Sequence, residues 1–221
     1  MKKLSYIFLC VLLVSSVLFS KTIENSKTYT IMLDPAGDAQ NTGRQIDDYL
    51  ERGITLQFAE KLKPQLEKMF DNVRVVLTRF PGEAIEHLQN ANFANRLDVD
   101  FYLSIHFYKE KAVKPHVYLY SFCRHDDFIT KRPDLYFYMY DQAHLINREQ
   151  TKACVAEMKN IFLCDNYKKM FEFCGVFNLP FKPLLAVKAP AVGIEIGLRK
   201  KEDWEKYLDV FVDCIEKIIG D

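Results

Sequence analysis

Three side chains of this 221-residue chain are of types that do acid–base or metal chemistry and stand at informative places: Glu51, His106 and Glu195. Glu195 interrupts the apolar run 192–196, and His106 ends an alternating segment. Each has an ordinary structural explanation: an ion pair for Glu195, a core hydrogen bond for His106, and compensation of the helix dipole for Glu51 at a helix start. Their joint placement is the more specific signal.

The elements that must position these side chains follow from hydrophobic periodicity, which alternates between the strand and helix patterns. We expect a single α/β domain over residues 28–221, with a mixed, mostly parallel sheet and helices on both faces. The expected strands are Thr28–Leu33, Val73–Leu77, Asp100–His106, Val117–Phe122, Leu184–Val187 and Ala191–Ile196, and the expected helices are Glu51–Phe70, Glu83–Leu97, Pro133–Leu163 and Glu202–Ile219.

Open α/β sheets bind ligands at the carboxyl ends of their strands. The polar loop 34–48 leaves the carboxyl end of the first expected strand, His106 ends the third, and Glu195 lies near the end of the last. We therefore expect Glu51, His106 and Glu195 to converge on one cleft at this edge.

The order of the segments resembles the zinc-dependent N-acetylmuramoyl-L-alanine amidases of the amidase 3 type, from about residue 30 to about residue 218. The resemblance rests on the Asp34-Pro35 loop, Glu51 at a helix start, Leu77-Thr78-Arg79, Ala94-Asn95, Ser104-Ile105-His106 and the run from Pro190 to Leu198. It implies the α/β fold described above. It also implies a zinc cofactor and a peptidoglycan substrate, cut at the amide between N-acetylmuramic acid and the L-alanine of the stem peptide.

The resemblance assigns roles position by position. Glu51 matches the family's glutamate zinc ligand, His106 its second histidine ligand, and Glu195 the catalytic glutamate that takes a proton from the metal-bound water and passes it to the leaving amine. The first histidine ligand, in an Asp-Pro-Gly-His-Gly motif, is replaced by Gly37, and the neighbouring Asp38 is the expected substitute donor.

This replacement bears on activity because catalytic zinc usually has three protein ligands and an open position for water, whose pKa it lowers to about 7. A set of Glu51, His106 and Asp38 is acceptable for zinc, but a second carboxylate makes the metal a poorer Lewis acid. Restoring histidine at Gly37 is expected to strengthen metal binding, if the backbone angle there allows it. His116 is an alternative replacement ligand, and Tyr108 stands where the family often has asparagine.

Two other functions remain open at this point. One is a pseudoenzyme that keeps the fold and binds cell-wall material or a partner without chemistry. The other is a cysteine hydrolase that uses Cys123 with His125 or His106. The direction of the Asp38 carboxylate discriminates between the pseudoenzyme and the metal enzyme. A carboxylate aimed at the same point as Glu51 and His106 favours the enzyme, and one that points to solvent favours the pseudoenzyme.

Composition and the amino terminus narrow the setting. Thirty basic residues balance thirty acidic ones, and no basic cluster is interleaved with aromatic residues, which argues against nucleic acid as a partner. Two lysines followed by the apolar run 4–19 predict a signal peptide over residues 1–20, and hence export to the periplasm or cell envelope, with an uncleaved anchor as the alternative. The sequence identifies no activating protein.

Overall fold

A computed structural model describes residues 27–124 and 138–220 and shows a six-stranded sheet with the order β4-β1-β5-β8-β6-β7. The strands are β1 (Tyr29–Pro35), β4 (Val73–Leu77), β5 (Phe101–Lys109), β6 (His116–Phe122), β7 (Glu172–Leu179) and β8 (Ala191–Leu198), beside the small hairpin β2 (Gln45–Ile46) and β3 (Tyr49–Leu50). The helices are α2 (Glu51–Met69), α3 (Gln89–Leu97), α4 (Arg148–Phe162) and α5 (Leu208–Gly220), with the 3-10 turns η2 (Tyr140–Leu145), η3 (Lys182–Leu184) and η4 (Asp203–Tyr207).

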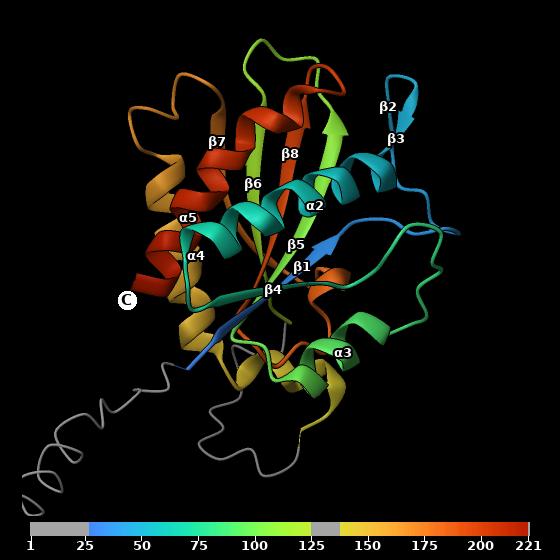
Figure 1. Cartoon of the computed structure of the whole chain (residues 1–221), viewed down its shortest axis with the longest axis vertical. Coiled ribbons are helices and arrows are strands. Elements are labelled where there is room, and N and C mark those ends of the chain that lie inside the picture. Colours follow the sequence, from blue (N-terminus) through green and yellow to red (C-terminus); the bar gives the residue numbers. More distant parts are fainter. Residues whose placement is uncertain (1–26, 125–137, 221) are drawn as a thin grey trace, which may run out of the picture.

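Four of the five strand pairings in the sheet are parallel, and only β6 runs antiparallel to its neighbour β8. The prediction of a single α/β domain with a mixed, mostly parallel sheet is therefore confirmed (Figure 1). The predicted signal peptide lies outside the described residues. Within the described ranges, no helix has both the length and the apolar character needed to span a membrane.

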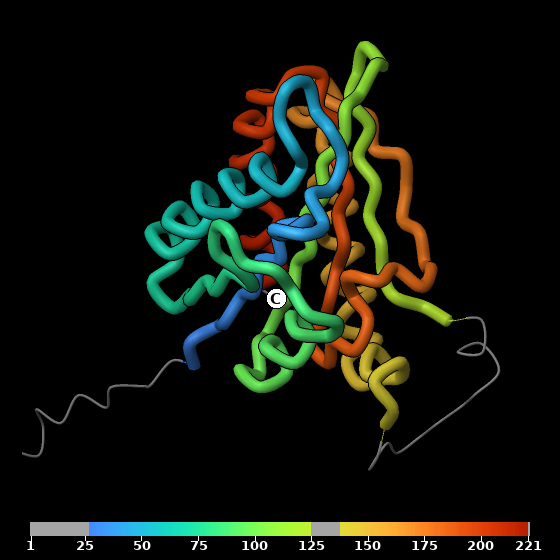
Figure 2. Tube along the Cα trace, turned by 90° about the vertical axis from the view of Figure 1, so that its right-hand side faces the viewer, coloured from blue at the N-terminus to red at the C-terminus, as the bar shows by residue number. Residues whose placement is uncertain are grey.

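One face of the sheet carries the larger core, under α2, α4 and α5 (Figures 1 and 2). Helix α2 forms because Ile54, Phe58, Leu62 and Leu66 recur at helical spacing, and all four are at most 1% exposed. The Phe58 ring meets the Phe211 ring of α5 at 4.8 Å between centroids, and other rings of the core surround it. This packing fixes the start of α2 above the carboxyl end of β5.

The opposite face has a smaller core, formed by α3 and the segment 182–189 against β1, β5 and β8. Ala91 and Ala94 give α3 a small-residue face, which lies against the buried Met32 and Tyr102 of the sheet. Helices thus lie on both faces, as expected, but unequally.

The predicted strand Leu184–Val187 is wrong. This stretch contains the end of η3 and a turn in which Ala186 has φ 69°, a left-handed conformation that a strand excludes. Leu184 and Val187 are fully buried because they pack in the smaller core, so the apolar run reflects a buried loop. The strand that the sequence did not reveal is β7, an edge strand paired in parallel with β6.

Three predicted helices are shorter than expected. The helix predicted over Glu202–Ile219 begins with the 3-10 turn η4, and its α-helical part, α5, begins only at Leu208. The helix predicted from Glu83 begins only at Gln89, because Leu88 has φ 62° and interrupts the right-handed backbone. In the predicted stretch Pro133–Leu163, the described part divides into η2 and α4, and residues 125–137 lie outside the described residues.

The larger core makes a stability prediction at Phe58. The Phe58→Ala variant should lose about 3–5 kcal/mol of unfolding free energy, because it removes a fully buried ring and leaves a cavity between α2, α5 and β5. Urea unfolding followed by circular dichroism measures the loss. Met69→Ala, at a side chain that is 64% exposed, is the control and should change little. Equal effects of the two variants would contradict the described packing.

Candidate functional site

Glu51, the first residue of α2, joins this helix to the carboxyl end of β5 through its carboxylate. Its Oε1 accepts a hydrogen bond from the backbone N–H of Phe107 at 3.0 Å, and its Oε2 accepts one from the backbone N–H of Arg44 at 3.0 Å. Strand β1 pairs with β5 only as far as Ile105, so the Phe107 N–H on that side would otherwise lack a partner. A residue that is only 3% exposed thus satisfies two backbone donors.

The loop before α2 approaches Glu51 closely at Gly43. This glycine has φ 72°, and a Cβ atom there would lie 2.7 Å from the Glu51 Oε2. Only glycine combines the left-handed angle with the missing Cβ, so Gly43 is what lets the loop close over the carboxylate.

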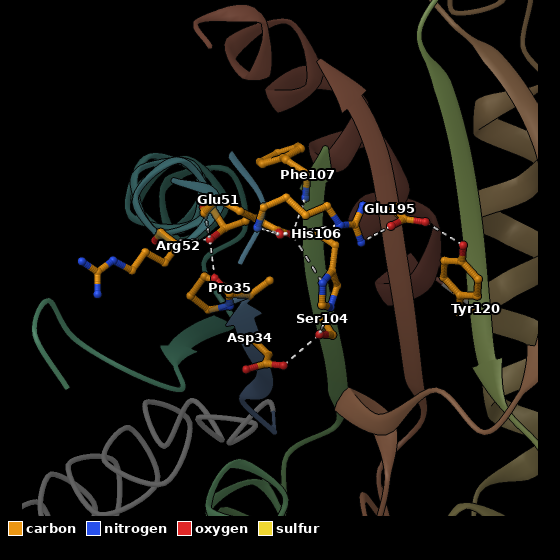
Figure 3. A network of polar contacts seen from close by, with 12 residues as sticks. Asp34, Pro35, Glu51, Arg52, Ser104, His106, Phe107, Tyr120 and Glu195 are labelled. Carbon is orange, nitrogen blue, oxygen red and sulfur yellow. Dashed lines mark hydrogen bonds and ion pairs between the residues drawn. The ribbon is translucent and has the colours of Figure 1, made fainter. Parts of the chain in front are cut away.

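His106 lies between Glu51 and a buried polar chain (Figure 3). Its Nδ1 is 3.6 Å from the Glu51 Oε1, and its Nε2 is 3.1 Å from the Ser104 Oγ. The Ser104 hydroxyl donates its hydrogen to the Asp34 Oδ2 at 2.8 Å, so the His106 Nε2–H must be the donor to Ser104. In neutral His106 this leaves the lone pair on Nδ1, the nitrogen nearest Glu51.

Asp34 orients this chain from the end of β1. Its carboxylate is 6% exposed and accepts hydrogen bonds from Thr78 Oγ1, Asn90 Nδ2 and Ser104 Oγ, each at 2.8 Å. No separate role for Asp34 was predicted from the sequence. The alternation of residues along the strand does predict that Ser104 and His106 lie side by side on one face. The buried Asp34 carboxylate therefore fixes the tautomer of His106 indirectly, through the hydroxyl of Ser104.

Glu195 lies on β8 directly beside His106, since the two residues are register partners across β5 and β8. Its Oε2 accepts a hydrogen bond from the Tyr120 hydroxyl of β6 at 2.8 Å, and its Oε1 forms an ion pair with the Arg44 Nη2. Burial, and then the bond to Glu195, raise the pKa of Tyr120 far above its ordinary value, so this hydroxyl stays a donor. Figure 3 shows Glu51, His106, Glu195 and Tyr120 in a row that crosses the strands β5, β8 and β6.

Arg44, like Asp34 and Tyr120, is a site residue that the sequence did not reveal. Its guanidinium reaches both acids: Nη2 pairs with Glu195, and Nε lies 3.9 Å from the Glu51 Oε2. It also lies over the Tyr108 ring, 5.7 Å from the centroid. Burial would raise the pKa of Glu51, but its contact with the His106 side chain, the hydrogen bond from the Arg44 backbone N–H and the charge of the Arg44 guanidinium together lower it, so Glu51 is ionised.

Asp38, the expected substitute ligand, uses its carboxylate within its own loop. Oδ1 accepts hydrogen bonds from the backbone N–H groups of Gln40 and Asn41 at 2.7 Å each, and Oδ2 accepts one from the Asn41 side chain at 3.1 Å. Although burial opposes it, these bonds lower the pKa of Asp38. The carboxylate closes an Asx turn and, in this arrangement, is not grouped with Glu51 and His106.

A metal ion would therefore find two protein donors here. The separation of 3.6 Å between the His106 Nδ1 and the Glu51 Oε1 fits two ligands of one zinc ion, because bonds of about 2.0–2.2 Å at a tetrahedral angle separate ligand atoms by about 3.4 Å. Over the described ranges, no group of three or more His, Cys, Asp and Glu side chains could hold a metal. Glu51 and His106 thus provide two of the three protein ligands that a catalytic zinc ion usually has.

The other candidate groups lie apart from this pair. His116 has its Nδ1 3.0 Å from the Glu110 Oε2 and is used there. Because β6 runs antiparallel to β8, with Tyr118 opposite Glu195, the chain moves away from this edge as it approaches Cys123. Cys123 lines a separate cavity of about 410 Å³ that includes His144, and His125 lies outside the described residues.

Gly37 supplies a test of this loop. The Gly37→His variant should lose about 1–3 kcal/mol of unfolding free energy, because φ is 79° and a Cβ would lie 2.8 Å from the Arg52 Cβ. Thermal or urea unfolding measures the loss. Gly53→Ala is the matched control: nothing lies within 4 Å of its added Cβ, and a helical alanine should stabilise by about 0.5–1 kcal/mol. A Gly37→His protein as stable as wild type would refute the steric account.

Comparison with solved structures supports the fold. Ami1, an N-acetylmuramyl-L-alanine amidase from Mycobacterium smegmatis, superposes with a TM-score of 0.60 at 17% identity, covering 89% of this chain and 99% of that one. An N-acetylmuramoyl-L-alanine amidase from Clostridium difficile 630 gives a TM-score of 0.55 at 21% identity, covering 88% and 96%. At these identities, the likeness shows a shared architecture.

Sequence comparisons identify the family as well as the fold. The chain is 34% identical over 76 residues to the N-acetylmuramoyl-L-alanine amidase CwlM of Bacillus licheniformis, a match that covers 34% of this chain and 30% of that protein. The family model described as N-acetylmuramoyl-L-alanine amidase, of the amidase 3 type, matches residues 31–210. That range contains all of the sheet except Tyr29 and Thr30, together with every site residue described above, and the chain therefore belongs to the amidase 3 family of N-acetylmuramoyl-L-alanine amidases.

Proposed function

We propose that this chain hydrolyses the amide between N-acetylmuramic acid and the L-alanine of the peptidoglycan stem peptide. Membership of the family supports this reaction. The observation that carries it is the row of Glu51, His106 and Glu195 on one edge of the sheet, contributed by α2, β5 and β8. These are the residues that match the family's glutamate ligand, second histidine ligand and catalytic glutamate.

Glu51 and His106 would hold the metal ion, for which we propose zinc. When bound, the ion supplies a Lewis acid for the scissile carbonyl and lowers the pKa of a bound water. The polar chain through Ser104 to Asp34 keeps the His106 Nδ1 lone pair available for this role. With two protein donors, we expect weak affinity, so that activity depends on added metal.

Glu195 is the proposed general base and acid. The Tyr120 hydroxyl donates a hydrogen bond to the Oε2 of Glu195, and the Arg44 guanidinium forms an ion pair with the Oε1. Its place beside His106 in the register puts it next to the reacting groups, where it would accept a proton from the attacking water and donate it to the leaving amine.

Aromatic rings beside Glu195 support a glycan-bearing substrate. Tyr120 stacks on Phe181 at 4.6 Å between centroids, and Phe181 meets the His106 ring edge-on at 5.2 Å. Phe177, 6.0 Å from the Tyr120 ring, is 42% exposed. Ring faces of this kind offer rigid, amphipathic contact area, which suits the apolar face of a sugar next to the lactyl amide.

The substrate sets the compartment. We propose that residues 1–20 direct export and that the domain works in the periplasm or cell envelope, where peptidoglycan is found. The apolar run without charge and the two leading lysines support the export of this domain.

A second candidate function is binding of cell-wall material without hydrolysis. It is favoured by one specific observation, that the Asp38 carboxylate is bound within its own loop. By the resemblance, the neighbouring Gly37 stands where the family has its first histidine ligand. In that case the row of side chains would still recognise the muramoyl-peptide junction, but no complete metal site would activate water.

The two functions are separated by product release from purified peptidoglycan with added zinc. Wild-type protein should release stem peptides, and Glu195→Gln should lower the rate by about 10²- to 10⁴-fold, because the proton acceptor is lost while shape is kept. Glu172→Gln on β7, whose side chain is 64% exposed, is the control and should retain the wild-type rate.

Absence of release by wild-type protein at every zinc concentration, together with co-sedimentation on peptidoglycan, would reject hydrolysis in favour of binding. Loss of both release and co-sedimentation would reject both.

A further inference from the structure

The guanidinium of Arg44 lies where the charges of the site meet. It pairs with the Glu195 Oε1 through Nη2, and its Nε is 3.9 Å from the Glu51 Oε2. The two acid side chains are only 4% and 18% exposed. Carboxylates that are largely shielded from water need a compensating cation, and Arg44 provides one for both.

The chain holds Arg44 in this position from several directions. Its backbone N–H donates to the Glu51 Oε2, so the main chain of residue 44 is tied to the same carboxylate that its side chain approaches. The Tyr108 ring lies under the guanidinium at 5.7 Å, and the Tyr108 hydroxyl is fixed by a hydrogen bond to the Glu110 Oε2 at 2.7 Å.

A divalent cation and this guanidinium compete for the same carboxylates. A cation bound by Glu51 and His106 would lie close to the positive charge of Arg44, and the two would repel each other. The same guanidinium also pairs with the Oε1 of Glu195, the proposed general base. The charge of the site is balanced by one cation or the other.

We propose that Arg44 is an internal cation that neutralises Glu51 and Glu195 in place of a metal ion, so that zinc binds to Glu51 and His106 only by displacing the guanidinium. The inference concerns the regulation of the proposed amidase site and rests on the part of that function in which Glu51 and His106 hold zinc. Once Arg44 is displaced, the Glu51 carboxylate is open to the ion, and Glu195 is free to serve as the proposed general base.

The test measures zinc binding by the full chain, with isothermal titration of ZnCl₂ into chelator-treated protein and metal analysis after dialysis. Arg44→Gln should tighten zinc binding by about tenfold or more, in the range by which groups around a metal site tune affinity. Arg44→Lys should stay close to wild type because it keeps the positive charge. The backbone N–H of residue 44 remains in each variant, so the bond to Glu51 is preserved.

Two controls identify the source of any gain. Arg74→Gln removes an exposed arginine from β4, at the far edge of the described sheet, and should leave zinc affinity unchanged. The double variant Arg44→Gln, Glu51→Gln should lose the gain, because it removes the carboxylate for which the two cations compete. Circular dichroism confirms that each variant is folded before titration.

Equal zinc affinity of wild type and folded Arg44→Gln would overturn the inference, and so would an equal gain in Arg44→Lys. These outcomes do not depend on catalysis. A tighter-binding, zinc-loaded Arg44→Gln that releases no stem peptide would leave the competition intact and count against the proposed hydrolysis instead.

Discussion

The carboxylate of Glu51 is the interaction on which the rest of the site depends. It accepts one backbone hydrogen bond from the end of β5 and one from the loop before α2, and so ties three segments together at a single buried acid. A helix start, a strand end and a loop are each weakly determined by themselves. Joined through one carboxylate, they set the distance between Glu51 and His106 and place Arg44 beside both.

The charge of that acid then organises its surroundings. An ionised carboxylate shielded from water requires positive charge or donors nearby, and the structure supplies two amides, an imidazole and a guanidinium. In a metal enzyme of this family, the ion provides the positive charge. In this chain the guanidinium of Arg44 lies beside both Glu51 and Glu195 and supplies positive charge from the protein itself.

The fold contributes rigidity to this arrangement. The aromatic core around Phe58 fixes α2 on the sheet, and the in-register pairing of β5 and β8 places Glu195 beside His106 without further side-chain contacts. A second buried acid, Asp34, then sets the ring orientation of His106 through Ser104. Packing thus fixes the position of α2, strand register fixes the position of Glu195, and hydrogen bonding fixes the orientation of the His106 ring.

The sequence by itself determined the α/β class, because strand and helix periodicity are local signals, and the order of its motifs carried the resemblance to the family. It also predicted that Glu51, His106 and Glu195 lie together, because open α/β sheets bind ligands at the carboxyl ends of their strands. It did not reveal β7, whose edge position gives no clean alternation, and it mistook the buried loop at Leu184–Val187 for a strand. Only the tertiary structure decided the partners of Asp38 and Arg44. Both sit in a loop without periodicity, where the direction of a side chain follows from which buried charges and amides the fold brings within reach.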